Sequence, residues 1–348
     1  MEKIRGKIIV HLCGGAGINL GKSVFEEIED LGPGFASFDL RYLDTSRANI
    51  SNVKYPDKFT LVETVKATKD GLDGSGGERS KNADDIIEYI KKYLDDNKLL
   101  SQKVAEYHLV VFSASGGSGS VIGPMLTKAL LERNIPTSVI MVGDSTNGLN
   151  AINTSKTIAT MNSIAKMTKK AINIMYTNNQ AHNDGCGLRK AEEKANRAIY
   201  NSSVTLALFL SNHNQNIDAQ DMVMFLDQTQ YKTINIKPGI YGMIGFSKRC
   251  EVPNGSIPIS GRSLTKDDID PDTGLTLLNH KAGIVLEENA DELFNDQYPV
   301  HLISFANFFT TEDKLLKKVV DDYKNIMNQI QIEDIEDEED PDENGLVF

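Results

Sequence analysis

Short apolar runs alternate with helical patterns over about the first 215 residues of this chain. Each run is followed by a polar loop and then by a helix pattern or a loop-rich stretch, which is typical of parallel strands joined by helices. We therefore expect a parallel sheet that is covered on both faces and binds its ligand at the carboxyl ends of the strands. The five expected strands span residues 7–13, 35–39, 108–113, 137–142 and 172–176.

The remaining pattern predicts a long helix, a smaller domain and a terminal helix. Residues 187–211 are helical in pattern, polar at first and apolar all round toward the end, which is typical of a helix buried between two domains. Residues 239–246, 282–287 and 300–306 are expected strands of a smaller mixed domain. Residues 312–331 predict an amphipathic helix whose buried side carries Leu315, Leu316, Val319, Val320, Tyr323 and Met327.

The fold class that these patterns predict is α/β. It combines a doubly wound parallel-sheet domain, a long central helix with its connecting loop, a smaller α+β C-terminal domain, a C-terminal helix and an acidic tail. The expected boundaries of these five parts are residues 1–186, 187–217, 218–311, 312–332 and 333–348.

Composition and charge narrow the classes of function. The chain has 348 residues, 40% of them hydrophobic, which is enough for two packed cores. The formal charge is −12, but nine acidic residues lie within 333–343, which leaves about −3 for the remainder. This balance argues against direct binding to nucleic acid or to an anionic membrane, because both need a clustered cationic face.

Cysteine usage predicts a reducing compartment. Cys13, Cys186 and Cys250 are far apart and have neither a pairing pattern nor zinc-site spacing. No apolar N-terminal stretch resembles a signal peptide or a membrane span. We therefore expect a water-soluble protein of the cytoplasm.

The first chemical signal is a glycine and serine loop between an apolar strand and a helix. Its residues are Ser115, Gly116, Gly117, Ser118, Gly119 and Ser120. Glycines let successive backbone N–H groups turn toward one point, serines add hydroxyl donors, and a helix that starts there adds the positive end of its dipole. The loop therefore predicts a phosphate site, with a plain tight connection as the structural alternative.

A second loop of this kind, residues 14–21, follows the first strand and leads into a helix that ends near residues 31–34. As a dinucleotide fingerprint it has one residue too many before its last glycine, although Asp39 could serve as the ribose-binding acid. As a P-loop it departs from the pattern only by alanine at the first position, and Lys22 would then hold phosphate. Neither interpretation explains the loop at residues 115–120.

In this order the features resemble the tubulin/FtsZ superfamily of nucleotide-driven filament proteins, most of all the phage-encoded, PhuZ-like tubulins. Residues 14–19 resemble the first phosphate loop of that family, residues 74–77 its third, and residues 116–120 its signature loop in the phage form. The acidic tail that closes on Leu346, Val347 and Phe348 is similar to that of the phage members. The resemblance covers the whole chain.

The resemblance implies that GTP or GDP binds with Mg²⁺ at these loops. Asn178 and Asn196 fall where family members contact guanine, and amides can pair with both donors and acceptors of the base. The nucleotide-binding residues that it assigns are Gly14, Gly15, Ala16, Gly17, Asn19, Gly76, Gly77, Ser115, Gly116, Gly117, Ser118, Gly119, Ser120, Asn178 and Asn196. Lys22 is then a solvated lysine of the first helix.

The sequence shows no His/Asp pair and no pair of carboxylates beside the glycine loops that could serve as a general base. Phosphoryl transfer to water nevertheless needs a positioned water molecule as the nucleophile. Residues 216–221 resemble the synergy loop, which completes the active site of the neighbouring subunit. Asp218 and Asp221 stand at i and i+3 at the start of a helix, so their carboxylates project on the same side and can converge on one water. Helix capping is the alternative role, and the two roles are compatible.

Two positions depart from the family pattern. Ser115 stands where most members have the first glycine of the signature, which tightens the approach of the backbone to phosphate. Glu78 occupies a position that is commonly asparagine, and its carboxylate would repel the terminal phosphate unless it points away or meets magnesium. Residues 143–148 are the expected ribose-side loop.

The expected function is a GTPase that polymerises head to tail into dynamic filaments, with hydrolysis completed between subunits. The resemblance implies a role in the bacterial cytoplasm, positioning phage DNA or the phage nucleus. The acidic tail is expected to dock on an adjacent subunit, on basic residues of the last helix such as Lys314, Lys317, Lys318 and Lys324. The alternatives are a plasmid-segregating tubulin relative, a P-loop NTPase and a dinucleotide-dependent oxidoreductase of the Rossmann type.

Overall fold

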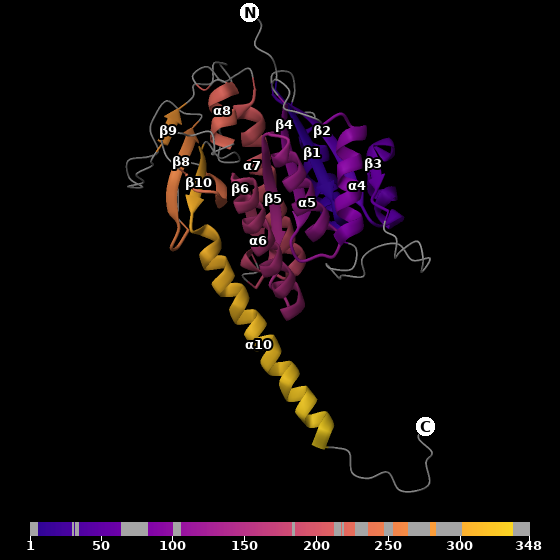
Figure 1. Cartoon of the computed structure of the whole chain (residues 1–348). Coiled ribbons are helices and arrows are strands. Elements are labelled where there is room, and N and C mark those ends of the chain that lie inside the picture. Colours follow the sequence, from indigo (N-terminus) through magenta and orange to yellow (C-terminus); the bar gives the residue numbers. More distant parts are fainter. Residues whose placement is uncertain are drawn as a thin grey trace, which may run out of the picture.

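Ten strands in the described part of the chain form one sheet in the computed structural model (Figure 1), in the order β3-β2-β1-β4-β5-β6-β7-β10-β8-β9. The structure describes residues 6–29, 31, 35–63, 83–99, 106–182, 185–211, 217, 219–226, 236–246, 253–263, 279–282 and 301–336. The strands are β1 (Lys7–Cys13), β2 (Ser37–Asp44), β3 (Phe59–Leu61), β4 (Glu106–Ser113), β5 (Thr137–Gly143), β6 (Ala171–Asn178), β7 (Gly239–Phe246), β8 (Ile257–Ser263), β9 (Asn279–Ala282) and β10 (His301–Ala306).

Helices follow most of these strands. The α-helices are α1 (Gly14–Leu20), α2 (Glu26–Ile28), α4 (Ala83–Asp96), α5 (Gly119–Glu132), α6 (Gly148–Thr168), α7 (Leu188–Phe209), α8 (Ala219–Leu226) and α10 (Phe308–Glu336). A π-helical turn, η1 (Gly21–Phe25), joins α1 to α2, and three 3₁₀ segments are η2 (Arg47–Asn52), η3 (Pro56–Lys58) and η4 (Asn179–His182). No helix among the described residues is both long enough and apolar enough to cross a membrane.

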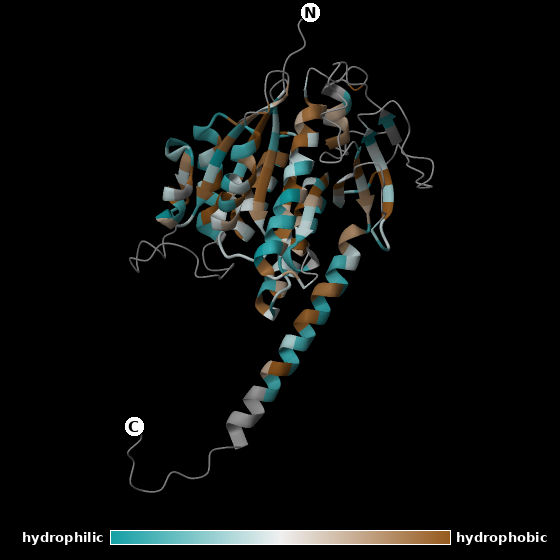
Figure 2. Ribbon diagram, turned by 180° about the vertical axis from the view of Figure 1, so that it is seen from behind, coloured by the Kyte–Doolittle hydropathy of each residue, from teal (hydrophilic) through white to brown (hydrophobic). Residues whose placement is uncertain are grey.

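The sheet is buried on both faces. Successive residues of a strand point to opposite sides of a sheet, and in the central strands both sets of side chains are covered by helices. In β1, Ile8 and Val10 pack into one core together with α1, η1 and the end of α7. Ile9 and Cys13 pack into the other core, which is covered by α4, α5, α6 and the start of α10. Figure 2 shows the apolar strands between these two layers of helices. The expected parallel sheet with two covered faces is confirmed.

The C-terminal strands extend the same sheet. Strand β7 pairs with β6 in parallel, from Ala171 opposite Gly239 to Ile174 opposite Gly242, and β10 then pairs antiparallel with β7 and β8. The expected strands at 239–246 and 300–306 are present, whereas residues 283–287 of the third lie outside the described residues. Strands β3 and β8 and helix α4 were not expected. The domain boundaries stay a prediction.

Helix α7 has the expected change of character along its length. Its first half is largely exposed, whereas every residue from Ser203 to Phe209 is buried. Helix α7 contacts β6, β7 and β10, so it spans the part of the sheet where the C-terminal strands join the parallel ones. Its end is fixed to the start of β1, because the backbone N–H of Gly6 donates to the carbonyl oxygen of Leu210 at 3.2 Å.

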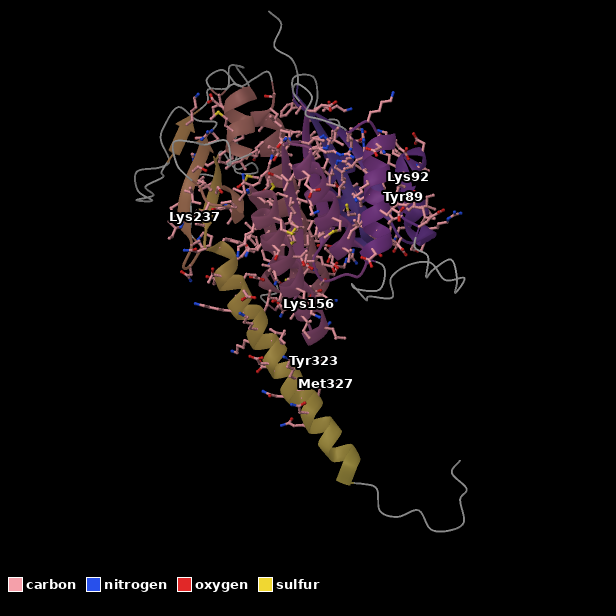
Figure 3. All side chains as sticks on the ribbon, viewed as in Figure 1. Tyr89, Lys92, Lys156, Lys237, Tyr323 and Met327 are labelled. Atoms are coloured by element: carbon pink, nitrogen blue, oxygen red, sulfur yellow. The ribbon has the colours of Figure 1, made fainter. Side chains whose placement is uncertain are left out.

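Helix α10 leaves the body of the molecule, and Figures 1 and 2 both show its distal half projecting beyond the sheet. Its proximal half packs against α6, where Tyr323 contacts Gly148, and Figure 3 labels Tyr323 and Met327 where α10 passes Lys156 of α6. Leu316 is fully buried, as expected. Two positions expected on the buried side are wrong, because Leu315 is 60% exposed and Met327 is 37% exposed. The face of α10 that contacts the body of the molecule is therefore narrower than the face that carries apolar side chains.

Candidate functional site

The two glycine loops meet at the carboxyl ends of β1 and β4, which are neighbouring parallel strands. A Cβ atom on Gly119 would lie 2.7 Å from the carbonyl oxygen of Cys13, and one on Gly14 would lie 2.6 Å from the backbone nitrogen of Gly119. Gly14 also has φ of +73°, a conformation that side chains rarely adopt. Only glycine allows this backbone contact, which confirms that both loops lie at one edge of the sheet.

A polar cavity of about 240 Å³ opens beside this contact. Helix α5 starts at its wall with Gly119, and α1, continued by η1, starts there with Gly14. The residues preceding both helices make no side-chain cap, so their first N–H groups can serve an anion. The lining residues are Cys13, Gly14, Gly15, Ala16, Asp44, Ser46, Asn49, Ser113, Gly116, Gly117, Ser118 and Gly119.

The end of β2 supplies a carboxylate to this cavity. Asp44 is buried, and its two carboxyl oxygens accept hydrogen bonds from the backbone N–H of Thr45 at 2.8 Å and from Asn49 Nδ2 at 2.9 Å. Burial raises the pKa of Asp44 above its ordinary value. Thr45 shares a further hydrogen bond with Ser118 of the glycine loop at 2.5 Å. This part of the site was missed, because the strand was expected to end at residue 39.

The dinucleotide interpretation was wrong about Asp39. This residue lies in the middle of β2 rather than at its end, and it pairs with Lys7 at 3.0 Å, with Lys58 at 2.8 Å and with Arg41 at 3.4 Å. Although burial opposes it, hydrogen bonds from the two lysines and the charge of Arg41 hold the pKa of Asp39 well below its usual range. Asp39 is therefore held in an ion-pair cluster away from the glycine loops.

A second cavity, of about 160 Å³, adjoins the first, because Ala16 and Ser113 line both. We call the two neighbouring cavities together the crevice; the glycine loops line one end of it, and asparagine side chains line the other. Asn196 of α7 donates from Nδ2 to Ser23 Oγ at 3.4 Å. The lining residues are Ala16, Asn19, Leu20, Ser23, Ser113, Val142, Asn179, Glu192 and Asn196.

Asn178 does not line this crevice, contrary to expectation. It is the last residue of β6, it is buried, and its Nδ2 donates to Glu312 Oε1 of α10 at 2.7 Å. Its Oδ1 accepts from Ser145 Oγ at 3.2 Å and from the backbone N–H of Gln180 at 2.9 Å. The next residue, Asn179, lines the crevice instead. The sequence shows two adjacent asparagines, and which of them faces the ligand depends on where β6 ends.

Other expected residues shape the loops without lining the crevice. Gly17 lets α1 approach β4, since its Cβ would lie 2.8 Å from the carbonyl oxygen of Val111. Ser115 Oγ bonds Ser113 Oγ at 3.0 Å, and Ser120 Oγ donates to the carbonyl oxygen of Gly117 at 3.0 Å. Residues 143–148 lie where β5 passes into α6, and among them Ser145 donates from Oγ to Asn178 Oδ1.

Lys22 is exposed on η1 and is not among the residues that line either cavity. The expectation of a solvated lysine is thus confirmed. In a P-loop this lysine would reach the phosphates, whereas Lys22 lies away from the cavity that the glycine loops line. Gly76, Gly77 and Glu78 lie outside the described residues.

Asp221 lies at the other end of the subunit. It is on α8, its side chain is 24% exposed, and its carboxylate accepts a hydrogen bond from Lys281 of β9. Asn173, near the start of β6, donates to the carbonyl oxygens of Phe225 and Leu226 at 3.0 and 3.1 Å, which places α8 beside the amino ends of the strands. Figure 1 shows α8 at the end of the sheet where β1 begins. Asp218 lies outside the described residues, so its convergence with Asp221 stays a prediction.

Glycine loops that converge with two helix starts at the carboxyl edge of a parallel sheet are typical of the nucleotide-binding α/β proteins. The chain belongs to the Tubulin/FtsZ family, since residues 7–187 match the model of that family's GTPase domain. The expected family, fold class and GTPase domain are confirmed.

Relatives and solved structures agree with this assignment. The chain is 25% identical over 288 residues to a phage tubulin-like protein of Pseudomonas phage 201phi2-1, covering 82% of this chain and 81% of the relative. It is 23% identical over 227 residues to one of Pseudomonas phage phiKZ, covering 64% and 62%. In fold it is similar to the GDP complex of the phage tubulin PhuZ, with a TM-score of 0.70, 21% identity and coverage of 99% and 100%. A protofilament of TubZ from bacteriophage PhiKZ gives a TM-score of 0.69 at 19% identity, covering 99% and 96%.

Proposed function

We propose that this GTPase binds GTP and GDP in the crevice, assembles head to tail, and hydrolyses GTP only between stacked subunits. The observation that carries the proposal is the separation of Asp221 from the crevice, at opposite ends of the sheet. Stacking two copies head to tail brings the α8 end of one subunit to the crevice of the next. The similar structures include a TubZ protofilament and a PhuZ201 filament, which supports assembly of this chain.

Guanine fits the second cavity chemically. The carboxamides of Asn19, Asn179 and Asn196 can donate and accept, and the carboxylate of Glu192 accepts only. Guanine offers N–H donors at N1 and at its 2-amino group and an acceptor at O6, which matches this mixture. The GDP complex of the similar phage tubulin supports the same ligand for this chain.

The crevice end of the molecule also carries apolar side chains that suit a docking surface. Ile50 is 40% exposed, Leu149 is 60% exposed and Leu188 is 55% exposed. Each follows the carboxyl end of a parallel strand, namely β2, β5 or β6, so all three belong to the end that holds the crevice. Large apolar groups on this rim favour contact with a second copy over contact with water.

Within the crevice, the chain's own groups bind and orient the nucleotide. Backbone N–H groups at the starts of α1 and α5 hold phosphate oxygens, and the amides at the other end hold the base. Of the carboxylates that line the two cavities of the crevice, both oxygens of Asp44 already accept hydrogen bonds, and Glu192 lies at the base end, away from the phosphates. The group that orients the attacking water is therefore Asp221 of the next subunit, together with Asp218.

Magnesium fits this arrangement as a ligand of the nucleotide. No three His, Cys, Asp or Glu side chains gather as a metal site within the described ranges. Mg²⁺ commonly binds through substrate phosphates and waters together with a few protein oxygens, and the hydroxyl of Ser46 is a hard oxygen donor at the phosphate end. When bound, the ion would neutralise the charge of the phosphates.

The test of the proposal is the dependence of turnover on protein concentration. GTP turnover per subunit is expected to rise steeply above the assembly concentration and to fall by about 10²-fold or more in dilute, monomeric protein, because the water-orienting group is then missing. GDP affinity, measured at the same dilution, should stay unchanged. Equal turnover per subunit at all concentrations contradicts the proposal.

For the cellular role, we infer that the filaments position phage DNA or the phage nucleus in the cytoplasm of the infected bacterium. The support is the phage origin of the tubulin-like relatives. Expression of a labelled copy during infection tests this role. A phage nucleus that stays centred when turnover is blocked would contradict it.

We also propose that the acidic tail contacts an adjacent subunit. Helix α10 continues through Glu336, so the acidic run begins within the helix, and its remainder lies outside the described residues. Lys314, Lys317, Lys318 and Lys324 are exposed on the same helix and offer an opposite charge. That the tail docks on these four lysines stays a prediction.

Removing residues 333–348 is expected to raise the critical concentration for assembly about tenfold at low salt, because the contacts between tail and lysines are lost. Pelleting across a series of protein concentrations measures this change. The difference between the full chain and the truncated chain should shrink at high salt. Deletion of residues 346–348 alone separates the apolar contribution from the charge, and unchanged assembly of the longer truncation at low salt refutes the tail contact.

A further inference from the structure

A carboxylate of the projecting helix reaches the end of β6. Glu312 stands in the second turn of α10, and its Oε1 accepts hydrogen bonds from the Tyr176 hydroxyl at 2.5 Å and from Asn178 Nδ2 at 2.7 Å. Burial, and then the charge of Glu312, raise the pKa of Tyr176 well above its ordinary value, so Tyr176 remains a donor. Glu312 is therefore tied to two residues of the same strand, more than 130 positions earlier in the chain.

The orientation of the Asn178 carboxamide is fixed by its other partners. Its Oδ1 accepts from Ser145 Oγ and from the backbone N–H of Gln180, which leaves Nδ2 to donate. Nδ2 donates to Glu312 Oε1 at 2.7 Å and, over a longer distance of 3.4 Å, to the Tyr176 hydroxyl, so Glu312 is its charged and nearer acceptor. Without it, a buried amide donor would lose its charged partner, which is costly in a protein interior.

The bond between Asn178 and Gln180 closes the backbone around Asn179, which lines the base end of the crevice with Asn19 and Asn196. A small shift of this turn would move the Asn179 carboxamide relative to a bound base. Hydrogen-bond recognition depends steeply on distance and angle. The geometry of the turn is thus set from one side by β6 and from the other by α10.

We propose that Glu312 is a positioning residue for base recognition: by holding Asn178, it sets where Asn179 presents its carboxamide to guanine. The inference rests on the proposed guanine site. It assigns a role in nucleotide selectivity to a residue that lies far outside the family-matched segment 7–187. It also links the nucleotide to the helix that carries the tail.

The neighbouring carboxylate provides a matched control. Asp313 accepts from Ser155 Oγ of α6 at 3.1 Å and pairs with Lys317 at 2.6 Å, and it makes no contact with β6 among the described interactions. Phe308 and Phe309 pack edge-on against Tyr176, with ring centroids 6.2 and 5.5 Å away, and they keep α10 seated when Glu312 is changed.

The experiment compares the affinities of GDP and ADP for the full chain at a concentration below assembly. Glu312→Ala is expected to weaken GDP about tenfold and ADP little, so the ratio of the two affinities falls about tenfold. Glu312→Gln keeps an oxygen acceptor at the same place and should stay within about threefold of the natural chain. Asp313→Asn should leave the ratio unchanged.

Three results would overturn the inference: an unchanged ratio in Glu312→Ala, an equal loss for GDP and ADP, or the same fall in Asp313→Asn. Thermal unfolding of each variant shows whether it is folded. If Glu312→Ala is not, Asn178→Ala cuts the same link from the other side and decides the question by the same ratio. A natural chain without preference for GDP over ADP would instead overturn the proposed guanine site.

Discussion

Replacing Asp221 by alanine is expected to lower GTP turnover by a factor of about 10²–10⁴, while GTP binding and filament formation persist. The carboxylate lies on α8, at the end of the subunit opposite the crevice, so its loss leaves the nucleotide contacts of its own subunit intact. Filaments of the variant should live longer, because subunits keep GTP. Phosphate release measures turnover, and pelleting measures assembly.

Lys22→Ala is the matched control, because Lys22 is exposed and lines neither cavity. It should change turnover less than about twofold, as expected for a surface substitution. The opposite pair of results, with turnover lost in Lys22→Ala and retained in Asp221→Ala, would contradict the catalytic role proposed for Asp221.

The second large effect is expected from Gly119→Ala. The new Cβ would lie 2.7 Å from the carbonyl oxygen of Cys13, so the two glycine loops must move apart at the phosphate end. Overpacking of this kind costs about 1–3 kcal/mol of unfolding free energy. Nucleotide affinity should fall at least about tenfold, because the N–H groups at the starts of α1 and α5 no longer converge. Chemical denaturation and a nucleotide titration measure the two effects.

Gly116→Ala is the control in the same loop, because nothing lies within 4 Å of a Cβ at that position. Its unfolding free energy should stay within about 0.5 kcal/mol of that of the natural chain. If Gly119→Ala were as stable as Gly116→Ala and bound nucleotide normally, the backbone contact between the loops would not be required for the site.

The central strands could be predicted from the sequence, because buried parallel strands are apolar on both faces and stand out as runs. The expected range 7–13 is β1 itself, and 108–113 and 137–142 fall short of β4 and β5 by only two residues and one. Strand β2 was cut short, because Asp39 and Arg41 interrupt the apolar run. The structure explains this pattern: Phe38 and Leu40 point into one core, while Asp39 and Arg41 line an open polar pocket near the sheet edge.

The place of the phosphate end could be predicted, because two glycine loops that each follow a strand and open a helix converge at the carboxyl edge of a parallel sheet. The base end could be predicted only to within one residue. Which of Asn178 and Asn179 lines the cavity depends on the residue at which β6 ends, and the sequence does not show that residue. Contacts of Asp221 with Lys281 and of Asn178 with Glu312 join residues 60 and 134 positions apart. No local pattern encodes such pairs, because they depend on how the whole chain packs. The roles of Asp218, Gly76 and Gly77 stay predictions.

Strand β6 has a mechanical consequence for a polymer of this subunit. Its amino end holds α8 through Asn173, and its carboxyl end leads directly into Asn179 at the crevice. Strands β5 and β7 bond it on either side, and eight residues of strand span about 25 Å. Because an extended, laterally bonded strand resists stretching, β6 fixes the distance between α8 and Asn179 within the subunit. In the proposed head-to-tail filament, nucleotide exchange would then act by bending the contacts between subunits rather than by stretching the subunits themselves.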